Sequence, residues 1–173
     1  MSIVTQGPVS AESYALPEWF AIYVMPRHEK RIAEHLRVRQ IEHFLPLYET
    51  LHNWKDGSKV TVQLPLFPSY LFARTIRTHR GRVLEVPGVV SVVGKRESSV
   101  ISEGYIDSLH KAVAFGKIEP HPYLSTGTSV RLRSGVLAGL QGIVLRQKSS
   151  YRVVLSLDLI MRSVAVEVNI ADL

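Results

Sequence analysis

The chain has 173 residues, of which 46% are hydrophobic and 21% are charged; this is enough apolar material for a packed core and excludes a globally disordered chain. Its formal net charge is +6, which favours a polyanionic neighbour, nucleic acid first. The chain has no cysteine, so disulfides, thiol nucleophiles and zinc–thiolate sites are excluded, and a cytoplasmic protein is expected. No apolar run is long enough to span a bilayer, and the N-terminus lacks the basic-then-apolar pattern of a secretory signal.

Strand and helix patterns alternate over the first two thirds of the chain. Residues 1–18 are polar and predict a flexible N-terminal segment. Apolar, β-branched and aromatic runs predict strands at residues 19–24, 44–50, 60–64, 69–74, 89–93 and 99–101. Helical periodicity predicts helices at residues 27–39 and 80–86 and a third that begins after Ser102. An Asp-Gly turn at residues 56–57 predicts a hairpin between the second and third strands. We interpret residues 19–116 as one α/β domain.

The last third of the chain has a different pattern. Residues 117–126 contain Pro120 and Pro122 without periodicity and are interpreted as a short linker. Four strand-like runs follow, at residues 129–133, 142–147, 152–157 and 164–168, separated by Gly, Ser and Asp turn signals. About 50 residues of this kind predict a small all-β barrel over residues 127–173.

Nothing in the sequence has the spacing of a catalytic site. Gly-rich phosphate loops and the Gly-x-Ser-x-Gly elbow are missing, and the carboxylates are scattered. His28 and His35 would share a helix face, but a third ligand at helical spacing is lacking, and a zinc site needs three or four. The sequence therefore predicts a binding protein that is not an enzyme and needs no metal or cofactor.

Four motifs, in this order, resemble the NusG family of transcription elongation factors. They are Trp19-Phe20-Ala21-Ile22-Tyr23 followed by Pro26 to Lys30, Leu66-Phe67-Pro68-Ser69-Tyr70-Leu71-Phe72, Pro87-Gly88-Val89 to Gly94, and Gly127 to Val144. The first three resemble the family's NGN domain and the fourth resembles its KOW motif. The resemblance covers residues 19–173. It implies an α+β NGN domain, with an antiparallel sheet flanked by helices, followed by a small SH3-like KOW barrel.

Three details are more typical of specialised paralogues of the RfaH, or polysaccharide-operon, type than of housekeeping NusG. Ser69 stands where the housekeeping factor usually has Gly, and residues 135–137 read Gly-Val-Leu in place of Gly-Pro-Phe. The run Phe-Leu-Pro-Leu-Tyr at residues 44–48 also suits the paralogues. The resemblance thus implies an antitermination factor, with housekeeping NusG, which engages the termination factor Rho, as an alternative.

The resemblance also implies where RNA polymerase would bind. In this family an apolar cup on the NGN domain contacts the clamp helices of the largest polymerase subunit, and the matching residues here are Phe67, Tyr70, Phe72, Val89 and Val92. Aromatic side chains dominate protein interfaces, but the same residues could fill the domain core. On a strand Tyr70 and Phe72 share one face, so both interpretations remain open.

A second polymerase contact is implied further along the chain. In the family this region reaches a gate loop on the other large subunit, which here corresponds to His79, Arg80 and Arg82; only the histidine matches the RfaH pattern. Bridging both sides would hold the clamp closed and disfavour pausing, a population shift without bond chemistry.

A basic helix face lies where the paralogues meet the non-template DNA strand. Helical spacing places Arg27, Lys30, Arg31 and Arg37 on one side. These side chains can neutralise phosphates, although a charged, solvated helix face is an ordinary feature of amphipathic helices.

The KOW barrel would recruit a second partner, either Rho or a small-subunit ribosomal protein. The apolar run Leu159-Ile160-Met161, at an expected hairpin tip, is the candidate contact; it could equally be tucked against the barrel or the NGN domain. The β-branched strands favour a barrel over a helical, fold-switched state. The protein is expected to act as a monomer. The alternative from another class is an RNA- or ribosome-associated KOW protein.

Overall fold

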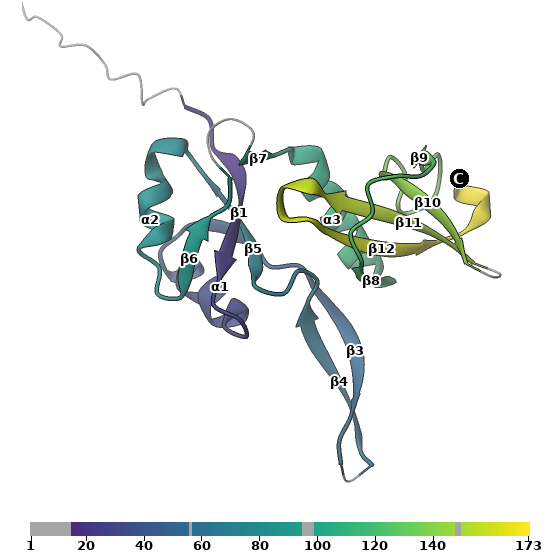
Figure 1. Ribbon diagram of the computed structural model, residues 1–173, viewed down its shortest axis with the longest axis horizontal. Coiled ribbons are helices and arrows are strands. Elements are labelled where there is room, and N and C mark those ends of the chain that lie inside the picture. Colours follow the sequence, from purple (N-terminus) through teal and green to yellow (C-terminus); the bar gives the residue numbers. More distant parts are fainter. Residues whose placement is uncertain (1–14, 56, 95–98, 148–149) are drawn as a thin grey trace, which may run out of the picture.

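The computed structural model describes residues 15–173 except residues 56, 95–98 and 148–149. Most of the predicted N-terminal segment and part of the predicted Asp-Gly turn therefore lie outside the described residues. The first domain is built on a five-stranded antiparallel sheet in the order β2-β5-β1-β6, with β7 also paired to β1 (Figure 1). Its strands are β1 (Glu18–Val24), β2 (Glu42–Phe44), β5 (Tyr70–Thr75), β6 (Val89–Val92) and β7 (Val100–Ile101).

Helices cover both faces of this sheet. They are α1 (Glu29–Val38), the short η2 (Arg77–His79) that runs into α2 (Arg80–Leu84), and α3 (Glu103–Phe115). Alternate residues of β1 enter different cores: Ile22 and Val24 pack with α1 and α2, whereas Trp19 and Ala21 pack with α3. The two cores are named the α1–α2 face and the α3 face below.

The predicted strand at residues 44–50 divides into two strands that belong to different sheets. Strand β2 ends at Phe44, and β3 (Leu47–Asn53) starts after Pro46. Proline has no N–H to donate to a ladder, so the chain can turn there; the Pro46 carbonyl accepts a bond from the Leu66 N–H at 2.9 Å. Strand β3 then pairs with β4 (Lys59–Pro65) in a hairpin that projects away from both sheets (Figure 1).

The second domain, which we call the barrel after the sequence prediction, is an antiparallel five-stranded sheet in the order β8-β12-β11-β10-β9, with β8 and β9 at its two ends. Its strands are β8 (Ile118–His121), β9 (Ser129–Arg131), β10 (Gln141–Gln147), β11 (Ser150–Leu157) and β12 (Arg162–Val168). The 3-10 turns η4 (Asp158–Ile160) and η5 (Ile170–Asp172) follow β11 and β12. Strand β8 differs from the prediction, because the proposed linker pairs with β12 over four residues. Pro120 is tolerated there because β8 is an edge strand.

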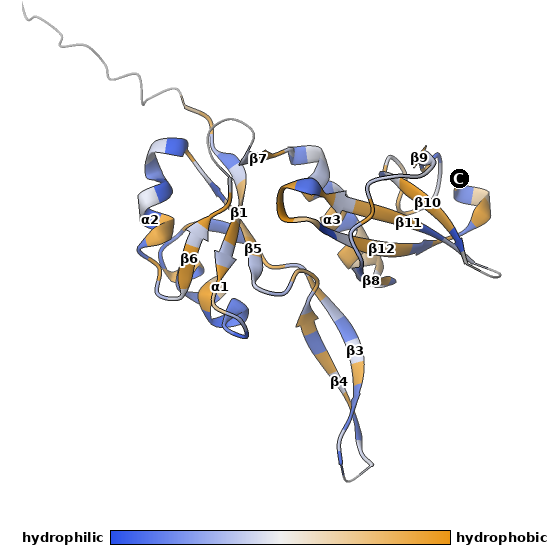
Figure 2. Cartoon of the chain, viewed as in Figure 1, coloured by the Kyte–Doolittle hydropathy of each residue, from blue (hydrophilic) through white to orange (hydrophobic). Residues whose placement is uncertain are grey.

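Helix α3 joins the two domains and is bounded by clear signals. The Ser102 hydroxyl accepts a bond from the Tyr105 N–H at 3.3 Å, as the predicted N-cap requires, and the helix stops at Gly116, whose φ is 81°. Its apolar side, Ile106, Leu109 and Ala112, belongs to one continuous core with the first sheet and the barrel. Apolar residues of β11 and β12 lie on the side of the barrel near α3 (Figure 2). The domains are therefore packed together in this structure.

Candidate functional site

The α3 face is covered at one end and open at the other. Cross-strand pairing places Phe72 opposite Ala21 and Tyr70 opposite Tyr23, so all four side chains share this face. Phe72 is buried, with its ring 5.6 Å from that of Phe67. Towards the other end the face opens: Tyr70 is half-buried, Tyr23 is 37% exposed, and their ring centroids lie 5.4 Å apart. We call these two side chains the tyrosine pair.

A strained turn fixes the position of Tyr70. Ser69 has a φ of 68°, a left-handed conformation that costs an L-residue roughly 1–2 kcal/mol. The buried carboxylate of Glu29, at the start of α1, accepts a hydrogen bond from the Ser69 N–H at 2.9 Å. The Ser69 carbonyl accepts from the Val24 N–H, and the Tyr70 N–H donates to the Phe67 carbonyl, both at 2.9 Å. The turn is thus held from both sides.

The five residues predicted to contact the clamp helices do not form one surface. Phe67 and Phe72 are 1% and 0% exposed and belong to the core. Val92 pairs with Ile22 and Val89 with Val24, so both valines pack against the α1–α2 face, on the opposite side of the sheet from Tyr70. Only Tyr70 combines partial exposure with a place on the α3 face.

Sequence reasoning missed Tyr23 and Glu29. Strand alternation from Ala21 places Tyr23 on the face of Tyr70 once β1 and β5 are paired, but that register is not visible in the sequence. No local pattern distinguishes Glu29 from the other charged residues of α1; its contact partner lies 40 residues along the chain.

The basic residues predicted to meet DNA are all exposed. Arg27 precedes α1 with a φ of 65°, and Lys30 and Arg31 lie in its first turn. Arg37 is different, because its Nε donates to the Glu34 carboxylate at 2.9 Å. That hydrogen bond lowers the pKa of Glu34 and raises the pKa of Arg37. Among the described residues, Arg37 forms an ion pair, whereas Arg27, Lys30 and Arg31 form none. These three residues are therefore the part of the predicted surface that is free to meet DNA.

The predicted gate-loop residues divide in the same way. His79 and Arg82 are exposed, but Arg80 lies with its guanidinium 4.0 Å from the centre of the Phe20 ring and donates to the Ser99 hydroxyl at 3.0 Å. Burial lowers the pKa of Arg80. This stacking gives Arg80 a structural role inside the domain.

The apolar tip of the barrel is mostly tucked in. Ile160 is 8% exposed, and Leu159 packs into the shared core, with its Cδ1 only 3.2 Å from where a Cβ on Gly94 would lie. Met161 remains 58% exposed. Beside this contact the Tyr123 hydroxyl donates to Asp158 at 3.0 Å, which raises the pKa of Tyr123, and burial raises the pKa of Tyr105 well above its ordinary value. Both phenols therefore stay neutral beyond the pH at which a free tyrosine ionises.

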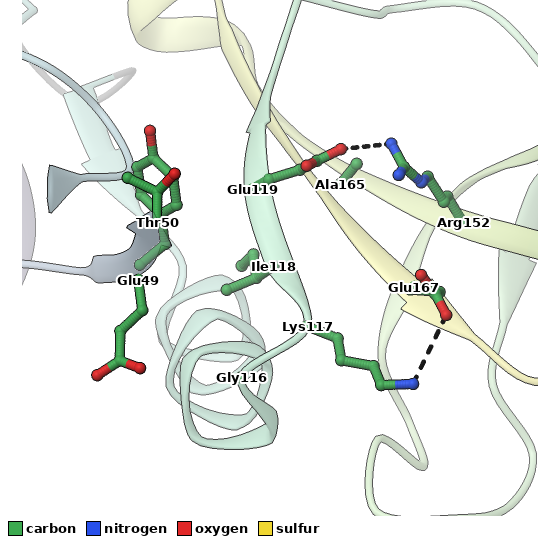
Figure 3. A pocket seen from close by; sticks show the side chains of 10 residues that line it. Glu49, Thr50, Gly116, Lys117, Ile118, Glu119, Arg152, Ala165 and Glu167 are labelled. Carbon is green, nitrogen blue, oxygen red and sulfur yellow. Dashed lines mark hydrogen bonds and ion pairs between the residues drawn. The ribbon is translucent and has the colours of Figure 1, made fainter. Parts of the chain in front are cut away.

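A pocket lined by several charged residues lies between the hairpin and the barrel. Figure 3 shows that its charged barrel residues are paired with one another: Arg152 with Glu119, and Lys117 with Glu167 at 3.6 Å. The remaining carboxylate of this pocket, Glu49, accepts a hydrogen bond from Gln63 at 3.3 Å. Among the described residues no group of three or more His, Asp or Glu side chains could hold a metal ion. No described helix is long and apolar enough to cross a membrane.

The family is shown by comparison with known proteins. The profile described as "Transcription termination factor nusG" matches residues 17–110, so the chain belongs to the NusG family. Its first domain is an NGN domain, its all-antiparallel second domain is consistent with a KOW domain, and the protein is a transcription factor of the elongation and termination class, not an enzyme.

The fold is supported by a solved structure with a TM-score above 0.5. The chain is similar to the structure titled "Domain interaction in Thermotoga maritima NusG", at 14% identity with a TM-score of 0.53, over 90% of this chain and 95% of that one. It also matches "MjSpt4:Spt5 complex conformation A" at 17% identity with a TM-score of 0.31, over 86% and 91% of the two chains. A search of curated proteins gave no match.

Proposed function

We propose that this protein binds RNA polymerase through the open end of its α3 face and modulates elongation by binding alone, without catalysing a reaction. The observation that carries the proposal is the tyrosine pair. Two aromatic rings with polar tips, partly exposed beside a rigid core, have the character of an interface anchor. The clamp helices of the largest subunit, which family resemblance implies as partner, would pack on this end.

The other contacts are assigned to the residues that remain exposed. His79 and Arg82 would face the gate loop of the other large subunit, while Arg27, Lys30 and Arg31 would meet the phosphates of the non-template strand. By contacting both large subunits, the protein would favour the closed state of the polymerase clamp and so suppress pausing or termination. Ser69 in the strained turn and the Phe-Leu-Pro-Leu-Tyr run support the paralogue type of factor, as they did from sequence.

The KOW barrel is proposed to recruit the second partner, Rho or a ribosomal protein. Of the three predicted tip residues only Met161 is open to such a partner while the domains are packed together. Release of Leu159 and Ile160 from the shared core would complete the apolar tip.

Equilibrium binding of the full chain to core RNA polymerase tests the proposal, with a polymerase that lacks the clamp helices as the control. We expect binding to the intact enzyme that is lost with the deletion, and shorter pauses on a template with a defined pause site. Equal binding to both polymerases would overturn the assignment of the clamp helices as partner.

A further inference from the structure

The tip of the β3–β4 hairpin is a surface that the proposed polymerase contacts leave unused. Every described residue from 51 to 61 is exposed. Strands of seven residues carry this tip roughly 20 Å from the hairpin base. Its loop is closed by bonds from the Trp54 N–H to the Ser58 carbonyl, at 2.9 Å, and from the Gly57 N–H to the Trp54 carbonyl, at 3.0 Å. The tip is therefore a shaped loop at the end of a projection (Figure 1).

Trp54 presents a large aromatic surface at this tip. The chain has two tryptophans: Trp19 is 5% exposed, whereas Trp54 is 56% exposed. The ring of His52 meets Trp54 edge to face, with centroids 5.5 Å apart and planes at 84°. This contact orients the indole while leaving more than half of the side chain open. Tryptophan is enriched where proteins contact their partners, because it combines a large apolar ring with a polar N–H.

The loop that follows Trp54 has a formal charge of about +1, because Lys55 and Lys59 outnumber its one acidic residue, Asp56, which lies outside the described residues; this favours an anionic ligand. Lys55 and Lys59 flank the loop, and neither takes part in an ion pair among the described residues. The carboxylate of Glu49, the acidic residue of the hairpin that the structure describes, lies towards the base, where it accepts a bond from Gln63 at 3.3 Å.

The apolar residues of the hairpin are spread over its two faces. Strand alternation places Leu51 on the face opposite to His52 and Trp54, whereas Val60, paired with His52, shares the face of Trp54. Figure 2 shows apolar residues scattered along both strands without a single block at the tip. A protein partner would be expected to meet a contiguous apolar patch with a central anchor. A single ring flanked by cations suits a base and its phosphates better.

We propose that the hairpin tip binds single-stranded nucleic acid, with an unpaired base stacked on Trp54 and the neighbouring phosphates beside Lys55 and Lys59. Stacking of a base on an aromatic side chain contributes roughly 1–3 kcal/mol and needs no particular sequence, because every base has a π-face. This contact is separate from the basic residues of α1 and does not depend on polymerase binding.

The two tryptophans make the test site-specific. The full chain is titrated with the single strands (dT)15 and (U)15 and with a 15-base-pair duplex, while tryptophan emission is followed. We expect quenching of the exposed Trp54 by a single strand, DNA or RNA, and little by the duplex. In Trp54→Phe the remaining emission comes from buried Trp19, so quenching should vanish while a labelled strand still binds through the phenyl ring. The Trp19 emission also reports that the NGN core is folded.

Three variants sharpen the assignment. Trp54→Ala should weaken binding of the labelled strand roughly 5- to 150-fold, the range that loss of one stacked base implies. Leu51→Ala, on the opposite hairpin face, should leave affinity unchanged. The Lys55→Gln/Lys59→Gln variant should reduce the slope of log K against log salt by about 1.4.

Several outcomes would overturn the proposal. Emission that no single strand quenches, in a chain whose Trp19 signal shows a folded core, would exclude stacking on Trp54. Equal quenching by the duplex would exclude selection of unpaired bases. Equal affinity of wild type and Trp54→Ala would place nucleic-acid binding elsewhere.

Discussion

The two faces of the NGN sheet differ in what covers them. The α1–α2 face is closed by helices of its own domain, and residues such as Ile22, Val24 and Leu71 are inaccessible. The α3 face is shared: α3 and the barrel bury Trp19 and Phe72, and the tyrosine pair stays partly open. The α1–α2 face thus contributes only to the stability of the domain, whereas the α3 face also has an exposed part to which a partner can bind. The predictions below test this difference.

Removing the ring at the centre of the α3 face should have the largest effect. Phe72 is fully buried and contacts the rings of Phe44 and Phe67. Phe72→Ala should lower the free energy of unfolding by about 3–5 kcal/mol, because a buried aromatic leaves a cavity that does not collapse. Urea denaturation measures this loss. A loss below about 1 kcal/mol would show that Phe72 is a surface anchor and not core.

Charging the barrel tip should separate the domains. Leu159→Asp places a carboxylate against Gly94 and the shared core, at a cost of roughly 1–3 kcal/mol in docking free energy. We expect a larger radius of gyration in small-angle scattering, with both domains still folded. Met161→Asp, two residues away and exposed, is the matched control and should leave the radius unchanged. An unchanged radius in Leu159→Asp as well would show that this contact does not hold the domains together.

Arginine 80 should contribute to stability more than to polymerase contact. Arg80→Ala removes the stacking on Phe20 and the bond to Ser99, and should cost about 1–2 kcal/mol in urea denaturation. Arg82→Ala, exposed on the same helix, should stay within about 0.5 kcal/mol of the wild type. If both variants are equally stable and both lose pause suppression, Arg80 belongs to the gate-loop contact.

The smallest effect is expected at the start of strand β1, at Glu18. The hydrogen bond from Arg77 Nε to Glu18, 2.7 Å long, lowers the pKa of Glu18. A lowered folded-state pKa means that the stabilisation is present above the ordinary carboxyl pKa of about 4.3 and is lost as the pH falls through the lowered value. Because the pair is partly exposed, the effect is below about 1 kcal/mol. Glu18→Gln should flatten this part of the stability–pH curve, whereas an unchanged curve would assign the acid sensitivity to other carboxylates.

Local patterns were enough to predict most strands, the third helix and the order of the two domains. Ser102 as the N-cap of α3 is confirmed, because a cap is a contact between near neighbours. The division of the strand at Pro46 was missed, although proline carries a local signal for it. Strand β8 was missed because Pro120 and Pro122 suggest a linker, while pairing with β12 is decided by residues about 45 positions later.

The candidate site was harder to predict from the sequence, because it depends on the register in which β1 pairs with its neighbouring strands. The β1–β6 ladder shifts register between Tyr23 and Val24, which places both Val89 and Val92 on the α1–α2 face. Neither that shift nor the stacking of Arg80 on Phe20 has a local sequence signal. Motif resemblance located the aromatic strand, and only the pairing of β1 with β5 assigned Tyr23 to the same surface as Tyr70.

The most direct test of the central claim is the affinity of full-length Tyr70→Ala and Tyr23→Ala for core RNA polymerase, measured beside Val92→Ala from the other face of the sheet. Because interface anchors contribute about 2 kcal/mol or more, each tyrosine variant should bind at least roughly 30-fold more weakly while remaining folded. Val92→Ala should bind as the wild type does. Wild-type affinity in both tyrosine variants, or an equal loss in Val92→Ala, would contradict the assignment of the open end of the α3 face as the polymerase contact.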